Sequence, residues 1–170
     1  MNKPGPEEYN PYYEKYISLM TEPDIRVALA AQPAEIRSAL AGVPEEKGAY
    51  AYAEGKWSIK ELLSHLIDGE RIFAYRALRI SRGDTTPIEG FEQDDYITNS
   101  HANDRSFASL LDELELQRRS NLLMLDKVDD AASSLMGIAS DSPVSARAIV
   151  YIMGGHIRHH VTLLKERYLA

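Results

Sequence analysis

Apolar residues recur along this chain with the spacing of amphipathic helices rather than that of strands. In four long segments they return every three or four residues, so each segment would present one apolar stripe to a core. These segments are 24–41, 58–82, 106–127 and 142–168. No segment shows the sustained alternation that is typical of a half-buried strand. The pattern therefore predicts an all-α protein with four main helices.

Residues with strong preferences for helix boundaries mark the limits of these segments. Ser58 and Glu61 form a capping box at the start of the second helix, in which each side chain accepts a hydrogen bond from the backbone N–H group of the other residue. Ser142 and Pro143 suit the cap and the first position of the last helix, where the missing N–H group of proline costs nothing. Pro33 falls inside the first segment and predicts a kink or a restart of that helix.

Two stretches of the chain lie outside this helical pattern. Segment 83–105 spans 23 residues without a clear period, which is long for a connection inside a compact domain. A crossover lets the second and third helices run parallel, so the pattern predicts a four-helix bundle with a long crossover between helices 2 and 3. A lid over a groove is the second interpretation of this segment. Residues 1–20, rich in proline and tyrosine, are expected to form an N-terminal arm packed on the bundle.

Three histidines are placed so that their imidazoles could meet inside such a bundle. His156 and His160 stand four residues apart, so they point the same way from successive turns of the last helix. In helical projection both fall on its apolar face, whereas His159 falls well off that face. His65 lies in the second turn after the capping box, at the edge of an apolar stripe, which suits a groove between helices.

Spacing alone leaves two chemical interpretations of these histidines open. Two imidazoles on successive helical turns can share one divalent ion, which would satisfy both buried rings. Alternatively, His156 and His160 form a buried hydrogen-bonded pair, and His65 packs as an ordinary core residue. His101 lies in a polar loop and is expected to be solvated.

Charged residues also occupy positions on the apolar faces. Glu70 falls about 20° from the centre of the stripe of the second helix, and Arg118 lies inward on the third helix together with Asn121. One interpretation is a buried ion pair that satisfies both charges. The other makes Glu70 a catalytic proton acceptor near the metal, with Arg118 and Asn121 as substrate-binding residues. In the crossover, Asp94 and Asp95 are expected to be solvated rather than to bind metal.

Taken together, these motifs resemble the DinB/YfiT-like superfamily of four-helix metalloproteins. The resemblance covers nearly the whole chain and rests on residues 57–66 (WSIKELLSHL), the following Glu70-Arg71, residues 90–96 (GFEQDDY) and the histidines of the last helix. It implies one divalent metal, most often nickel or zinc, on a histidine of the second helix and two histidines four apart on the last. Here these positions are His65, His156 and His160.

The resemblance also sets the functional alternatives. Similar proteins include S-transferases and isomerases that use low-molecular-weight thiols, and others known only as metal-dependent hydrolases. We therefore expect a metal-dependent enzyme with a small-molecule substrate, and we prefer small-thiol-dependent S-transfer to hydrolysis. A non-catalytic bundle with a structural metal, as part of a homodimer, is the remaining alternative. A fourth protein ligand on the metal would mark a structural site, whereas a coordination position open to exchange would mark a catalytic one.

Composition limits the binding partners and the cellular location that we expect for the protein. A chain of 170 residues with 44% hydrophobic residues can bury one substantial core, so 1–170 is expected to be a single domain. The formal net charge of -7 argues against nucleic acid as a partner. Neither a signal-peptide pattern nor an apolar run of membrane-spanning length occurs, so we expect a cytoplasmic protein. Without cysteine, any thiol chemistry must use a thiol from a cosubstrate.

Overall fold

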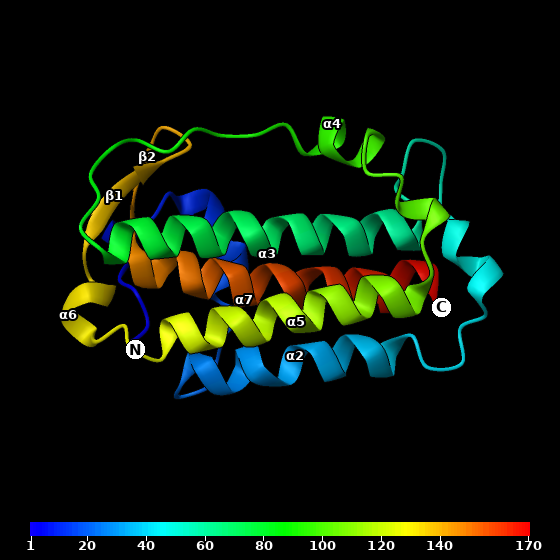
Figure 1. The fold of residues 1–170 in the computed structure, drawn as a ribbon, viewed down its shortest axis with the longest axis horizontal. Coiled ribbons are helices and arrows are strands. Elements are labelled where there is room, and N and C mark those ends of the chain that lie inside the picture. Colours follow the sequence, from blue (N-terminus) through cyan, green and yellow to red (C-terminus); the bar gives the residue numbers. More distant parts are fainter.

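Four long helices form the body of the protein in the computed structural model, which describes residues 1–170 (Figure 1). They are α2 (Ile25–Ala39), α3 (Ile59–Ser81), α5 (Phe107–Leu125) and α7 (Ala146–Leu163), which continues as a π-helical turn through Leu164–Tyr168. The connections contain the short helices α1 (Glu14–Ile17), α4 (Gln93–Thr98) and α6 (Asp130–Ser133) and 3-10 turns at Pro6–Glu8, Pro11–Tyr13, Glu45–Ala49 and Ala102–Asp104. None of the helices has the length and apolar character that crossing a membrane requires.

The predicted crossover is confirmed by the directions of the helices. Helices α3 and α5 run the same way, and α2 and α7 run opposite to them (Figure 1). Both α2 and α3 pack on α5 and on α7. Because α3 and α5 are parallel neighbours, the chain must return along the bundle between them, and segment 83–105 with α4 makes that return.

Side-chain caps explain where the long helices begin. Four side chains accept a hydrogen bond from a backbone N–H group of the first turn; they are Asp24, Ser58, Ser106 and Ser145. At the start of α3, the Ser58 N–H group also donates to the Glu61 carboxylate at 2.7 Å, which completes the predicted capping box. α2 continues through Pro33, so the helix does not restart there.

The chain before α7 forms a β-hairpin where the sequence predicted the first turn of a helix. Strand β1 (Met136–Ala139) pairs antiparallel with β2 (Ser142–Ser145), so Pro143 lies in a strand and α7 begins only after it. Strands of four residues are too short to show an alternating pattern. The two-residue turn places Ser140 and Asp141 at φ 50° and 60°, the left-handed conformation that such hairpin turns use.

This hairpin holds the first part of the crossover against the bundle. The Ile88 N–H group donates to the Ile138 carbonyl at 2.9 Å, and the Ser140 N–H group donates to the Ile88 carbonyl at 2.9 Å. The crossover is therefore fixed by backbone hydrogen bonds close to the point where it leaves α3.

The N-terminal arm packs closely on α7. Tyr16, Ile17 and Met20 are buried, and α1 lies against α7. A Cβ atom on Gly155 would lie 2.0 Å from the backbone oxygen of Tyr16, so the approach of the two backbones requires glycine at this position. The close contact places the arm beside the turn of α7 that carries His156.

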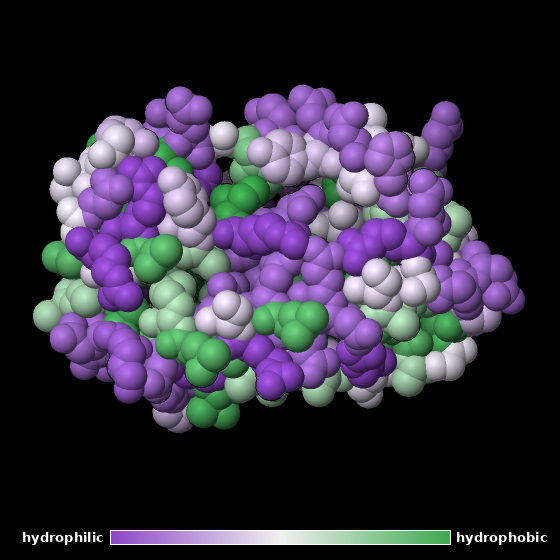
Figure 2. All heavy atoms as spheres, viewed as in Figure 1, coloured by the Kyte–Doolittle hydropathy of each residue, from purple (hydrophilic) through white to green (hydrophobic).

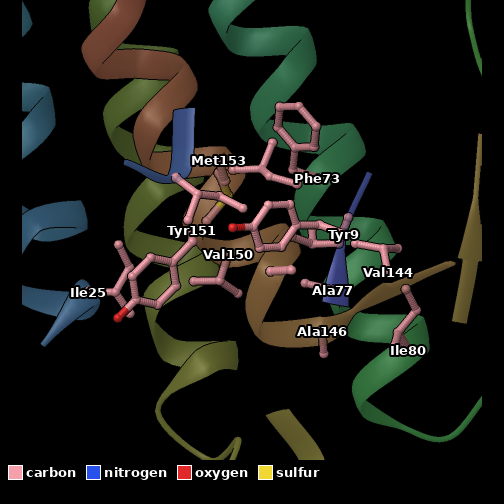
Figure 3. Packing of buried hydrophobic residues seen from close by; sticks show 14 of the residues in the cluster. Tyr9, Ile25, Phe73, Ala77, Ile80, Val144, Ala146, Val150, Tyr151 and Met153 are labelled. Carbon is pink, nitrogen blue, oxygen red and sulfur yellow. The ribbon is translucent and has the colours of Figure 1, made fainter. Parts of the chain in front are cut away.

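The apolar core consists of two clusters that follow one another along the bundle. The larger one joins the N-terminal arm to the first parts of α2 and α7 and the last part of α3, and Figure 3 shows a portion of it. The smaller one contains the other ends of α2, α3 and α7 and the first half of α5. Four hydrogen-bonded side chains lie between the clusters; this polar layer consists of Gln32, Glu70, Arg118 and Asn121.

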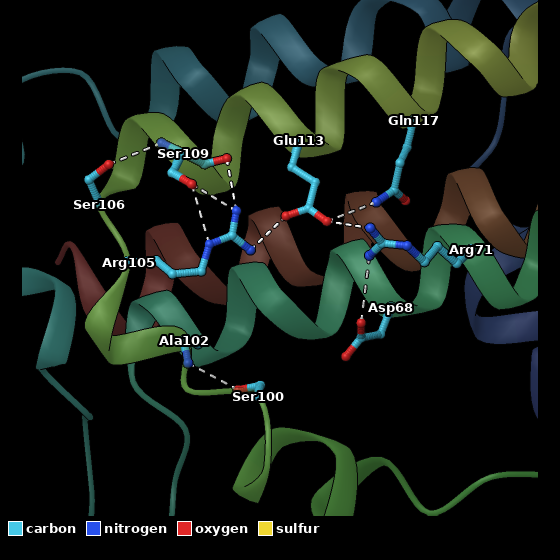
Figure 4. A network of polar contacts seen from close by, with 9 residues as sticks. All are labelled: Asp68, Arg71, Ser100, Ala102, Arg105, Ser106, Ser109, Glu113 and Gln117. Atoms are coloured by element: carbon cyan, nitrogen blue, oxygen red, sulfur yellow. Dashed lines mark hydrogen bonds and ion pairs between the residues drawn. The ribbon is translucent and has the colours of Figure 1, made fainter.

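On the outside of the bundle, ion pairs connect α3 and α5 to the end of the crossover (Figure 4). The Glu113 carboxylate accepts a hydrogen bond from Arg71 and pairs with Arg105 Nη1 at 2.6 Å. Arg105 also donates to the Ser109 hydroxyl at 2.8 Å. Because these groups are partly exposed, each pair contributes only about 0–1 kcal/mol, and its main effect is to fix the relative positions of the three segments.

Candidate metal centre

The structure brings His65, His156 and His160 together in the interior of the bundle. His65 comes from α3 and the other two come from α7, and all three side chains are buried. One ring nitrogen from each lies within 4.8 Å of the others, and the Nε2 atoms of His65 and His156 are 2.9 Å apart. No cysteine, aspartate or glutamate joins this group. We call these three residues the histidine cluster.

Burial keeps the histidine cluster in the neutral form that metal binding requires. Desolvation lowers the pKa of His65 to about 4 despite the opposing charge of Asp94, and it lowers the pKa of His160 to about 3. The pKa of His156 is lowered well below its usual value by desolvation and by the two neighbouring rings. At neutral pH all three imidazoles therefore have a free lone pair.

The hydrogen-bonding needs of the cluster are not met by the protein. His160 Nδ1 is buried and has no partner, and the one hydrogen bond of the cluster joins His65 to His156. Leaving a buried polar nitrogen unpaired is costly, typically about 1–3 kcal/mol. A divalent ion held at about 2.0–2.1 Å from each ring needs ligand nitrogens no more than about 4.2 Å apart, so small side-chain adjustments would let this donor set hold a metal.

Aromatic side chains hold the rings of the cluster in place. Trp57 lies over His65 with ring centres 4.7 Å apart, and the edges of Tyr16 and Phe73 meet His156, each at 5.5 Å. These contacts come from three separate parts of the chain, the arm, the start of α3 and its middle. They restrict the ring orientations without using the ring nitrogens, which remain available to a ligand.

A cavity of about 730 Å³ opens beside His65 and His156. Its walls come from the arm, α3, the crossover and the hairpin, and Figure 2 shows a hollow between the crossover and the helices below it. The lining residues are Tyr12, Tyr13, Tyr16, His65, Gly69, Phe73, Arg76, Gly90, Phe91, Glu92, Gln93, Asp95, Tyr96, Ser140 and His156. A second cavity, of about 310 Å³, reaches His160 from the side of Trp57. Gln93 borders both cavities, so the crossover also covers the cluster, as the lid interpretation expected.

Comparison with known proteins places this chain in a family. A family model described as the DinB superfamily matches residues 28–164, which include the whole histidine cluster. The chain belongs to the DinB superfamily. No curated protein sequence matches it.

The fold of this DinB-superfamily chain is similar to that of YfiT from Bacillus subtilis, described as a probable metal-dependent hydrolase with an unusual four-helix bundle topology. The two structures match with a TM-score of 0.76 over 98% of this chain and 93% of that chain. Their sequences are 16% identical, so the match establishes the fold and leaves the activity to be argued from the site.

Glu70, Arg118 and Asn121 lie apart from the cavity, in the polar layer of the DinB bundle. Arg118 donates to both oxygens of Glu70 at 2.8 and 2.7 Å, and Asn121 donates to Glu70 at 2.8 Å. Arg118 also donates to the Leu29 carbonyl and to Gln32. The structure thus contains the buried ion pair, and neither Glu70 nor its partners line the cavity. It gives no support to a catalytic Glu70 or to substrate binding by Arg118 and Asn121.

The remaining polar residues of the crossover divide between the cavities and the solvent. Asp95 lines the larger cavity and Asp94 the smaller one. Both are exposed, and neither joins the histidine cluster. His101 is exposed, as expected for a solvated loop residue.

One residue of the larger cavity was missed by the sequence analysis, and that residue is Arg76. It lies 11 residues after His65, about three turns along the same face of α3. Its side chain is 3% exposed. The signal was therefore present in the helical projection, but projection alone does not show which inward-facing residues border a cavity.

Proposed function

We propose that this chain is a metal-dependent enzyme in which His65, His156 and His160 bind one divalent ion, nickel or zinc. The observation that carries the proposal is the position of the histidine cluster at the wall of a cavity of about 730 Å³. Cavities of this size bind small-molecule substrates. Three protein ligands leave at least one coordination position for exchange, which favours a catalytic site over a closed structural one.

The chain itself contributes three buried, fixed imidazoles beside a cavity. A bound ion would supply Lewis-acid chemistry, polarising an electrophile or lowering the pKa of coordinated water or thiol. Trp57, Phe73 and Tyr16 pack around the rings of the cluster and give the adjoining cavities apolar walls. The crossover forms the opposite wall of the cavity, so it restricts the approach of substrate to the open face.

Transfer of a small thiol to an electrophile is the reaction that we propose. Glu70 is bound to Arg118 and Asn121 and does not line the cavity, so it is not available there as a general base. A thiol ordinarily ionises near pH 8.5 and therefore needs less help than water to become a nucleophile at neutral pH. Since the chain has no cysteine, the thiol would come from a cosubstrate.

Hydrolysis is the second candidate. The description of YfiT, which shares the fold, as a probable metal-dependent hydrolase favours it. The carboxylates of Glu92 and Asp95 line the cavity and are the side chains that could accept a proton from water.

Cobalt substitution separates the two reactions. We expect a small cellular thiol, added to the cobalt-loaded protein, to produce a sulfur-to-cobalt charge-transfer absorption band and to support metal-dependent transfer to an activated aryl halide. The variant His160→Ala should lose both signals. The matched variant His159→Ala should keep them, because His159 lies outside the histidine cluster.

Two other results would redirect the proposal. Metal-dependent cleavage of activated esters, with no absorption band for any thiol in the panel, would replace thiol transfer by hydrolysis. If the loaded protein shows neither reaction and its ion does not exchange ligands, the metal is structural.

A further inference from the structure

We propose that Arg76 is the anion-binding residue of the larger cavity and that the natural substrate or cosubstrate has a carboxylate group bound there. This inference rests on the proposed function in one respect, that the bound ligand is a substrate or cosubstrate of an enzyme. The binding site itself is a property of the cavity and does not depend on the metal. Its basis is a buried guanidinium that lacks a counter-charge.

Arg76 differs from the other inward-facing arginine of the bundle in having no acidic partner. Its side chain is 3% exposed, yet no aspartate or glutamate carboxylate pairs with it. Arg118, equally buried, is bound to both oxygens of Glu70. A buried charge without a partner is strongly disfavoured. Accordingly, desolvation lowers the pKa of Arg76.

The hydrogen bonds of Arg76 use only part of its donor capacity. Nη2 donates to the Glu89 carbonyl and to the Ser140 hydroxyl, each at 2.9 Å. These bonds fix the side chain between the crossover and the hairpin. Nε is buried without any partner, and no acceptor in the protein binds Nη1. Nε and Nη1 lie on different edges of the guanidinium, so they do not form a fork for one carboxylate. A rigidly held guanidinium with a free Nε–H group can still donate a charge-assisted hydrogen bond to one oxygen of an anion.

The position of Arg76 relative to the histidine cluster defines the kind of ligand. Eleven residues of α3 separate it from His65, which corresponds to about 16 Å along the helix axis. Side chains of a helix lean toward its N-terminus, which here is the end that carries His65. Both residues line the same cavity. An extended small molecule could therefore place its carboxylate at Arg76 and its reacting end near the cluster.

A carboxylate fits the charges of the cavity better than a phosphate does. Arg76 is the one arginine or lysine among the lining residues, while Glu92 and Asp95 are acidic. A single positive charge can balance one negative charge, but a dianion would leave an excess of negative charge beside these carboxylates. The tyrosines and phenylalanines of the walls provide apolar surface for the middle of the ligand.

The test measures binding of hexanoate, hexanol and hexyl phosphate to the metal-free full-length protein by NMR titration. Metal-free protein is used so that hexanoate cannot bind an ion at the histidine cluster. We expect hexanoate to bind about tenfold more tightly than hexanol, and we expect it to shift the Nε–H signal of Arg76. Arg76→Gln should bind the acid and the alcohol equally.

Two matched variants control for lost charge and lost packing. Arg82→Gln removes the same charge from an exposed position at the end of the same helix and should keep the tenfold preference. Ser140→Ala removes the hydrogen bond from Arg76 Nη2 to the Ser140 hydroxyl but keeps the guanidinium, and it should also keep the preference for hexanoate. If Arg76→Gln does not fold, the Arg76 Nε–H signal of the wild-type protein decides the question alone.

Equal binding of hexanoate and hexanol to the wild-type protein, or an unchanged preference in Arg76→Gln, would overturn the assignment. A preference for hexyl phosphate over hexanoate would overturn the choice of carboxylate. Zinc titration of the same samples separates this proposal from the proposed function. A carboxylate preference without zinc binding removes the metal-dependent enzyme and leaves the Arg76 site, and zinc binding without the preference does the reverse.

Discussion

The buried polar side chains of the bundle differ from region to region in how completely the protein satisfies their hydrogen-bonding groups. In the polar layer, Glu70 accepts hydrogen bonds from Arg118 and Asn121, and Arg118 extends the network to Gln32. Gln32 in turn donates to the Gly154 carbonyl at 2.7 Å, so all four long helices are joined. In the histidine cluster and at Arg76, by contrast, buried nitrogens have no partner in the protein.

This difference distinguishes a structural group from a binding site. Burying polar atoms is tolerated where every donor meets an acceptor, and the polar layer meets this condition through bidentate geometry. Unpaired atoms beside a cavity have a cost that a ligand can remove. The polar layer therefore aligns the helices, whereas the histidine cluster and Arg76 are the places where ligands are expected to bind.

The largest expected effect comes from breaking the polar layer. Arg118→Ala leaves the Glu70 carboxylate buried without its charge partner and should lower the free energy of unfolding by about 3–5 kcal/mol. Arg119→Ala, an exposed neighbour on the same helix, should change it by less than about 0.5 kcal/mol. Urea denaturation of the metal-free proteins measures both.

The double variant Glu70→Leu with Arg118→Leu sharpens this test, because it removes both charges. It should recover much of the stability lost in Arg118→Ala. Equal destabilisation by the single and double variants would show that the pair matters through packing and not through charge.

The next largest effect concerns metal affinity. His156→Ala removes one of three ligands and should weaken binding of zinc by at least about 100-fold, measured by competition with a chromophoric chelator. His159→Ala should stay within about threefold of the wild type, since its side chain contacts the rings of Tyr16 and His160 without joining the cluster. Similar losses in the two variants would mean that the ligands were wrongly assigned.

A third prediction concerns the pH dependence of stability in the metal-free protein. The pKa of His160 falls from 6.5 to about 3 on burial, so between these values the unfolded chain binds a proton that the folded chain does not. Stability must therefore decrease as the pH falls below 6.5, by about 2 kcal/mol between pH 7 and pH 5 for this residue. In His160→Gln this part of the decrease should disappear, while His101→Gln, altered at an exposed site, should retain it.

The last prediction tests the attachment of the arm. Gly155→Ala places a Cβ atom 2.0 Å from the Tyr16 backbone oxygen, which must move, and we expect a loss of about 1–3 kcal/mol in the free energy of unfolding. Gly154→Ala meets only side-chain atoms, at 3.1 Å or more, and should cost less. Faster proteolysis of residues 1–20 in Gly155→Ala alone would locate the change in the arm.

Local sequence signals predicted much of this structure because the relevant interactions are local. The capping box placed the start of α3 at the correct residue, and the four-residue spacing placed His156 and His160 on one face. The β-hairpin escaped prediction because its strands are four residues long. The contact of Tyr16 with Gly155 depends on segments brought together only by the folded chain, so no periodicity could reveal it. Helical projection places Arg76 on the same face as His65, but only the folded chain shows that this residue borders a cavity.

Anomalous diffraction from crystals of the zinc-loaded protein tests the central claim most directly. The account predicts a single strong peak within about 2.0–2.1 Å of one nitrogen each from His65, His156 and His160, with no fourth side chain bound and the remaining position facing the larger cavity. A peak closed by a fourth residue such as Asp94 would contradict the catalytic assignment. The absence of any peak at the histidine cluster would contradict the metal centre itself.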